Sequence, residues 1–242
     1  MTSILLEVCV EDAAGLMAAV EGGADRIELC SALSVGGLTP SPGLMTMAAR
    51  LDVPVYAMIR PRPGDFVFGT DDISIMRAEI DAVRVAGLAG VVLGASRSSG
   101  NLDVATLRLL VEHAAGLGCT LHRAFDLVPD FAEAVDIAVA LGFERILTSG
   151  GAKKAPDGVD ALASIMTAAN GRISIMPGSG VTLETIDGIL SRLSVSEVHS
   201  SCSIDKPAHD PRLVSLGFVA PSFKRTDADV VRKLKAQLTA AL

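Results

Sequence analysis

Short apolar segments recur along the chain at start-to-start spacings of 22 to 36 residues. They are rich in Val, Ile and Leu, a composition typical of strands that are buried on both faces of a parallel sheet. The pattern therefore predicts eight strands, over residues 4–10, 26–30, 54–60, 90–94, 119–125, 145–150, 173–178 and 197–201.

Between these segments, apolar residues recur with the period of a helix. Asp103 and Asp130 are placed to cap the helices that follow them, and Gly142 is placed to end the second of these. A further helix is expected to begin near Thr182, and an apolar stripe over 230–238 predicts a last helix at the end of the chain. The chain thus alternates strand and helix throughout.

Eight strand–helix units within 242 residues predict a (β/α)8 TIM barrel of the α/β class, with residues 1–242 forming a single domain. The alternative is a doubly wound open sheet. Against it, no G-x-G-x-x-G follows the first predicted strand. No linker or low-complexity tract interrupts the pattern, so we expect one closed barrel.

Composition and charge limit the kinds of partner that the protein is expected to bind. The formal net charge is −7 and no Lys/Arg cluster occurs, which argues against nucleic acid. No apolar run approaches the roughly 18–20 residues that cross a bilayer, and the first residues lack a basic leader, so we expect no membrane partner and a cytoplasmic location. Four cysteines in such a chain are expected to be buried thiols, metal ligands or reactive groups rather than a disulfide framework.

Charged residues and cysteines gather at the predicted strand ends, where barrels place their sites. Because side chains alternate along a strand, Glu7 and Cys9 share one face of the first strand, and Glu28 and Cys30 share one face of the second. The same Glu-x-Cys pattern therefore occurs on two neighbouring strands.

The third, fifth and eighth strands add further polar side chains at the same end of the barrel. We expect all of them to form a ring that is either a structural salt-bridge network or a ligand site, and their number at strand ends favours a ligand site. The ring comprises Glu7, Glu28, Arg60, Arg62, His122, Arg123, Asp126 and His199.

Two glycine-containing or proline-containing loops extend the candidate site. Gly178 and Gly180 follow the seventh strand, where backbone N–H groups of barrels often hold a phosphate, although these glycines can equally serve a tight turn. The loop 33–43 after the second strand is predicted to act as a lid, whereas no role is assigned to residues 202–228.

Long motifs in order along residues 4–201 resemble those of the CutC family, which is named for a proposed role in copper homeostasis. The motifs are EVCVED, EGGADRIELCSAL, GGLTPS, VYAMIRPRPGDFVF, LHRAFD, RILTSGG, IMPGSG and EVHSS. The resemblance implies a TIM barrel, a cytoplasmic copper-binding protein with Cys9 and Cys30 as Cu(I) ligands, and self-association as a dimer or tetramer. Ser179 departs from the glycine that is common in the family, which weakens the phosphate-loop interpretation.

Copper and catalysis make different demands on the same residues. Soft thiolates and thioethers select Cu(I), and barrel closure would bring His199 and Cys202 towards Cys9, with Met58 beside Cys30. Alternatively, Cys9 and Cys30 are simply small buried side chains. Cys119 lies at the start of its strand and is expected only to pack.

The competing hypothesis is an enzyme, an isomerase, lyase or hydrolase acting on a small anionic or sugar-like molecule. Glu7, Glu28 or His122 would then act as general acid or base. The arginines at positions 60, 62 and 123 would bind the anion by paired hydrogen bonds. A non-catalytic ligand-binding barrel is a third possibility. The leading prediction is Cu(I) binding, with catalysis as the alternative.

Overall fold

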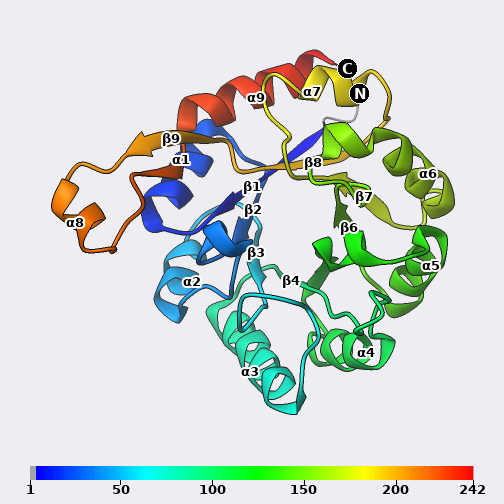
Figure 1. Ribbon diagram of the computed structural model, residues 1–242. Coiled ribbons are helices and arrows are strands. Elements are labelled where there is room, and N and C mark those ends of the chain that lie inside the picture. Colours follow the sequence, from blue (N-terminus) through cyan, green and yellow to red (C-terminus); the bar gives the residue numbers. More distant parts are fainter. Residues whose placement is uncertain (1–3, 242) are drawn as a thin grey trace.

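The computed structural model describes residues 4–241 and confirms the predicted barrel (Figure 1). Eight parallel strands lie in the order β7-β6-β5-β4-β3-β2-β1-β8. Each begins within one residue of its predicted start. Their bounds are β1 Leu5–Val10, β2 Arg26–Leu29, β3 Val55–Met58, β4 Gly90–Leu93, β5 Gly118–Leu121, β6 Arg145–Thr148, β7 Ser174–Pro177 and β8 Glu197–Ser200.

The barrel closes where β7 meets β8. These two strands are neighbours in space, yet within residues 4–241 no backbone ladder joins them, so they form the two ends of the hydrogen-bonded sheet. Ser174 Oγ and Ser196 Oγ lie 3.3 Å apart across this seam. The barrel is therefore held by seven backbone ladders and one side-chain contact zone.

Helices surround the sheet, and the predicted caps at the start of two helices and the end of one are confirmed. Asp103 accepts a hydrogen bond from Thr106 N and Asp130 accepts one from Glu133 N, while Gly142 adopts φ 84° at the end of its helix. The helices are α1 Ala13–Gly22, α2 Pro42–Ala48, α3 Thr70–Ala86, α4 Val104–His113, α5 Phe131–Leu141, α6 Val159–Ala169, α7 Ile186–Leu190 and α9 Ala228–Ala240.

Two predicted boundaries are wrong by four residues. The strand expected over 119–125 ends at Leu121, because His122 caps a 3-10 helix, η2 (Arg123–Leu127), by accepting a hydrogen bond from Ala124 N on its Nδ1. The helix expected near Thr182 begins only at Ile186. There the Thr185 hydroxyl accepts from Thr182 N and donates to Gly180 O, which closes a tight turn before the helix.

The strands separate an apolar outer layer from a charged interior. Leu6 and Val8 of β1, for example, are fully buried against the surrounding helices, where they join the main core. Alternate residues of the same strands point into the barrel, as Glu7 and Arg26 do. Because the core between sheet and helices is continuous, the barrel interior is free to carry polar side chains.

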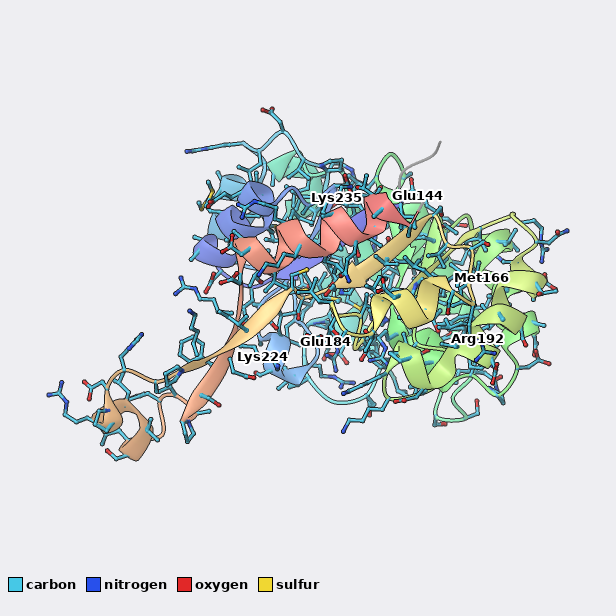
Figure 2. All side chains as sticks on the ribbon, turned by 90° about the horizontal axis from the view of Figure 1, so that it is seen from above. Glu144, Met166, Glu184, Arg192, Lys224 and Lys235 are labelled. Carbon is cyan, nitrogen blue, oxygen red and sulfur yellow. The ribbon has the colours of Figure 1, made fainter. Side chains whose placement is uncertain are left out.

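The segment between β8 and α9 forms an arm that projects from the barrel (Figures 1 and 2). It contains β9 Ser203–Pro207, α8 Pro211–Ser215 and β10 Ser222–Thr226, with β9 and β10 paired antiparallel. Lys224 on β10 is labelled in Figure 2. None of the helices within residues 4–241 has the length and apolar character needed to cross a membrane.

Candidate functional site

A chain of ion pairs fills the interior of the barrel. The Arg26 guanidinium bonds Glu7 through its Nε and Glu197 through one terminal nitrogen. Arg145 lies 3.4 Å from the Glu197 carboxylate and stacks 4.8 Å from the Tyr56 ring centroid. All of these groups are largely buried, so each charge depends on the others for compensation. Glu7 is the member of this ion-pair network that reaches the mouth of the barrel, where it contacts His199.

Above this chain, three side chains from neighbouring strands converge at the barrel mouth. Cys9 on β1, Glu28 on β2 and His199 on β8 place one ligand atom each within 4.8 Å of the others. The register explains the convergence, because Cys9 pairs with Glu28 and Glu7 pairs with His199. Thiol, carboxylate and imidazole are metal-ligand groups, so we name this group the mouth triad.

The ring of His199 is oriented by Glu7. Its Nδ1 lies 2.8 Å from Glu7 Oε1, and its Nε2 lies 3.8 Å from Glu28 Oε2. Metal-binding histidines usually have a carboxylate bonded to one ring nitrogen, which fixes the ring while the other nitrogen faces the metal. Glu28 Oε1 is buried and has no hydrogen-bond partner among the described residues.

Electrostatics in the triad favour charged His199. Burial opposes the imidazolium, but the charges of Cys9 and Glu28, with hydrogen bonds to Cys9 and Glu7, raise the pKa of His199 well above its usual value. Burial raises the pKa of Glu28, with a further contribution from Glu7, although His199 opposes this. A cation bound here would replace the proton on His199.

Cys30 lies next to the triad rather than within it. Its Sγ is 3.5 Å from Glu28 Oε2, and burial, followed by the nearby Glu28, raises the pKa of the Cys30 thiol well above its usual value. Cys30 and Met58 pack in one cluster beneath Gly37, where an added Cβ would meet Cys30 Sγ at 3.2 Å and Met58 Cε at 3.4 Å. The Cys30 sulfur therefore adjoins the mouth triad, and Met58 packs in the same cluster as Cys30.

A cavity of about 590 Å³ opens above the triad. Arg60, His122 and Arg123 line it together with Cys9, Glu28 and His199, so most of the predicted polar ring shares one cavity. Cys202, which barrel closure was expected to bring towards Cys9, lines the cavity as well. Leu33 and Gly36 from the loop predicted as a lid also form part of its wall.

Two other predicted ligand residues, Arg62 and Asp126, make structural contacts instead. Arg62 bonds Asp65 and Asp72 at 3.1 Å each and is not among the cavity-lining residues of the described chain. Asp126 accepts hydrogen bonds from Arg123 and from the backbone N–H groups of Ser149 and Gly151, which fixes the loop after β6. The Arg123–Asp126 pair therefore stabilises that loop.

The glycines after β7 have separate roles. An added Cβ at Gly178 would lie 2.4 Å from Leu147 and 3.2 Å from His199, so Gly178 permits close packing. Gly180, with φ +71°, lines the cavity beside Lys154. The following helix α7 is only five residues long, which offers little dipole for a phosphate.

The sequence did not indicate Arg26, Arg145 or Glu197 as part of the site. Each lies at or near the start of a strand, where barrel residues usually contribute to stability, and only the strand register shows that their side chains point inward. A charged residue at the first position of a buried strand, as in RIEL of β2 and EVHS of β8, is the signal that was available.

These features define a (β/α)8 barrel with an ionised interior and a candidate metal or ligand site at its C-terminal mouth. The sequence profile of the CutC family matches residues 4–204. The chain therefore belongs to the CutC family.

Relatives and solved structures agree. A CutC family protein of Sinorhizobium medicae is 65% identical over 240 residues, covering 99% of this chain and 98% of the relative. A Streptococcus agalactiae CutC, described as a candidate copper homeostasis protein, has TM-score 0.78 and 33% identity, over 82% of this chain and 98% of its own. Thiamine phosphate pyrophosphorylase of Pyrococcus furiosus, at 13% identity and TM-score 0.62 over 100% of this chain and 98% of its own, shares the fold alone.

Proposed function

We propose that the protein binds a metal ion at the mouth triad, with Cu(I) as its cargo. The observation that carries this proposal is the placement of the Cys9, Glu28 and His199 ligand atoms within 4.8 Å of one another. Metal–sulfur bonds of about 2.3 Å and metal–nitrogen bonds of about 2.0 Å allow one ion to bridge atoms at such separations. The copper part of the proposal comes from the family and from the description of its Streptococcus member.

The donor set fits a soft or borderline cation. A thiolate and an imidazole suit Cu(I), and Cys30, which packs with Met58, adjoins the triad with a further sulfur. The buried, unpartnered Glu28 Oε1 also fits a cation. Glu7 would hold His199 in the tautomer that leaves Nε2 for the ion. Cys9 and Cys30 remain the proposed thiol ligands, with Cys9 the central one.

An anaerobic competition titration against a chromogenic Cu(I) chelator tests this function. Wild type is expected to hold one Cu(I) per chain, and Cys9→Ser to weaken it at least tenfold. Cys119→Ser is the matched control, because Cys119 is also buried but packs in the outer core. Equal Cu(I) affinity in both variants would overturn the proposal. A parallel Zn(II) titration shows whether the carboxylate shifts the preference towards a borderline ion.

Catalysis on a small anionic or sugar-like molecule is the second candidate function. The cationic residues Arg60, Arg123 and Lys154 line the same cavity as the triad, which favours an anionic ligand. Screening small anionic metabolites for turnover, with Arg60→Ala as the control, tests it.

The proposal also covers the cellular location and the oligomeric state of the protein. We place the protein in the cytoplasm, where its four cysteines, all free thiols, would stay reduced and able to bind Cu(I). The homo-oligomer, dimer or tetramer, that the family resemblance implies stays a prediction, which light scattering on the purified chain tests directly.

A further inference from the structure

The cavity wall formed by the ends of β3 and β5 carries a histidine with a fixed tautomer. His122 Nδ1 accepts a hydrogen bond from Ala124 N at 3.1 Å, so the ring hydrogen lies on Nε2. Burial lowers the pKa of His122 to about 3, with a further contribution from the Arg60 charge, so the ring is neutral at pH 7. His122 Nε2 is buried and has no partner among residues 4–241.

Arg60 presents a second donor of the same kind. One terminal nitrogen donates to Val35 O at 2.9 Å and to Gly37 O at 3.1 Å, and the other donates to Gly64 O at 2.7 Å. These bonds fix the guanidinium plane. Its Nε is buried and has no acceptor among the described residues.

Phe66 covers both donors. The ring centroids of Phe66 and His122 are 4.8 Å apart, and Arg60 Cζ lies 4.8 Å from the Phe66 centroid. All three residues line the cavity, and Phe66 belongs to the loop between β3 and α3. A buried donor without an acceptor is unfavourable, so two such donors lining one cavity point to a ligand oxygen.

Glu28 on β2, the strand next to β3, presents the complementary group. Glu28 Oε1 is a buried acceptor without a partner among the described residues, and Glu28 lines the same cavity. A ligand that satisfies all three atoms needs an anionic oxygen that accepts from the two donors and a hydroxyl that donates to Glu28. Small hydroxy carboxylates have this pattern.

We propose that the cavity binds a small hydroxy carboxylate whose carboxylate accepts hydrogen bonds from His122 Nε2–H and Arg60 Nε–H and whose hydroxyl donates to Glu28 Oε1. Binding requires the Phe66 ring to move off the two donors. This inference rests on the second candidate function, since it names the class of anion. Because Glu28 also belongs to the mouth triad, the inference is tested on metal-free protein.

Histidine NMR on the ¹⁵N-labelled chain in EDTA tests the proposal directly. The chain has four histidines, and the His122→Gln spectrum assigns the one in the cavity. Sodium glycolate is expected to shift the His122 Nε2–H signal saturably. Acetate, which lacks the hydroxyl, is expected to bind about tenfold more weakly, and ethylene glycol, which lacks the carboxylate, is expected to leave the signal unchanged.

Variants then separate a ligand donor from a packing role. His122→Phe is expected to weaken glycolate at least tenfold. His122→Gln, which retains an N–H donor, is expected to weaken it less. His113→Gln, at the end of α4 and outside the cavity lining, is the control and is expected to bind like wild type. Circular dichroism confirms that each variant folds.

Two results overturn the inference. If glycolate gives no saturable shift in wild type, the donors are satisfied by the Phe66 ring face instead. If acetate binds as tightly as glycolate, the Glu28 side plays no part and the hydroxy carboxylate class is wrong. Glycolate binding without turnover of any hydroxy acid would reject catalysis and keep the ligand. Because the sample is metal-free, neither result depends on the copper titration.

Discussion

Glu7 Oε1 and His199 Nδ1 lie 2.8 Å apart across the ladder between β1 and β8. The other oxygen of the same carboxylate accepts a hydrogen bond from Arg26 Nε in the barrel interior. Burial alone would raise the pKa of Glu7, but the hydrogen bond from His199 and the Arg26 charge lower it to about 2. Glu7 therefore links the ionised barrel interior to the mouth triad, and its charge positions the His199 ring.

Replacing Glu7 with Gln is expected to destabilise the protein by about 3 kcal/mol, because it leaves buried Arg26 and His199 without their shared anion. Urea unfolding measures the change. Asp160→Asn is the control. It breaks the exposed ion pair with Arg192 and is expected to cost less than about 1 kcal/mol. Similar losses in the two variants would show that the buried network contributes no special stability.

The neutral His122 makes stability depend on pH. Its pKa is lowered from 6.5 to about 3 by burial and then by Arg60, so between these values the unfolded chain binds a proton that the folded chain does not. Stability from this group is complete above pH 6.5 and is lost as the pH falls towards 3. The expected slope is about 1.4 kcal/mol per pH unit in mid-window. Comparing urea unfolding of wild type and His122→Gln from pH 6.5 to 4 measures it, and equal slopes would contradict it.

Gly94 is expected to tolerate no side chain. An added Cβ would lie 2.5 Å from His122 Nδ1 and 3.1 Å from Ala124 Cβ. Gly94→Ala should therefore displace the imidazole and destabilise the protein by about 1–3 kcal/mol. Gly188→Ala is the matched control, because its Cβ meets nothing within 4 Å and it lies in α7, where Ala is neutral or stabilising. Thermal unfolding of both variants decides the matter.

The arm is expected to contribute little to the stability of the barrel. Ser203 and Thr226 are paired at its base, so a short Gly-Ser turn can replace residues 204–225. Leu216 and Phe218 near its tip are 69% and 74% exposed, so their removal deletes almost no core. The shortened chain should unfold within a few degrees of wild type. The arm meets the barrel where β10 packs against α1. A large loss of stability would show that this contact stabilises the barrel, and a change of mass by light scattering would show that the arm contacts a second copy.

The sequence predicted the barrel because its strands are buried on both faces and begin with strong apolar runs, as at ILLEVCV and GVVLG. The predicted helix caps at Asp103 and Asp130 were correct because each depends only on a side chain and the backbone N–H three residues later in the sequence. The end of β5 was misplaced, since the His122 cap depends on a local hydrogen bond that alternation of apolar residues does not encode.

The candidate site was predicted in part for a similar reason. Position on a strand placed Cys9, Glu28 and His199 at one end of the barrel, but only the register shows that their ligand atoms converge while Cys30 lies to one side. Arg123 and Asp126 looked like ligands because a sequence does not show that a loop uses them as its own anchor. Contacts between residues that are distant in the sequence cannot be predicted from the periodicity of apolar residues.

The seam between β7 and β8 makes ligand binding at the barrel mouth detectable by hydrogen exchange. His199 lies on β8, and the edge of that strand which faces β7 carries no backbone ladder within residues 4–241. Amide hydrogens on this edge are expected to exchange with deuterated solvent faster than those that β8 donates to β1. A ligand that holds His199 would slow exchange at β8 first, so occupancy of the mouth can be followed by mass spectrometry on unlabelled protein.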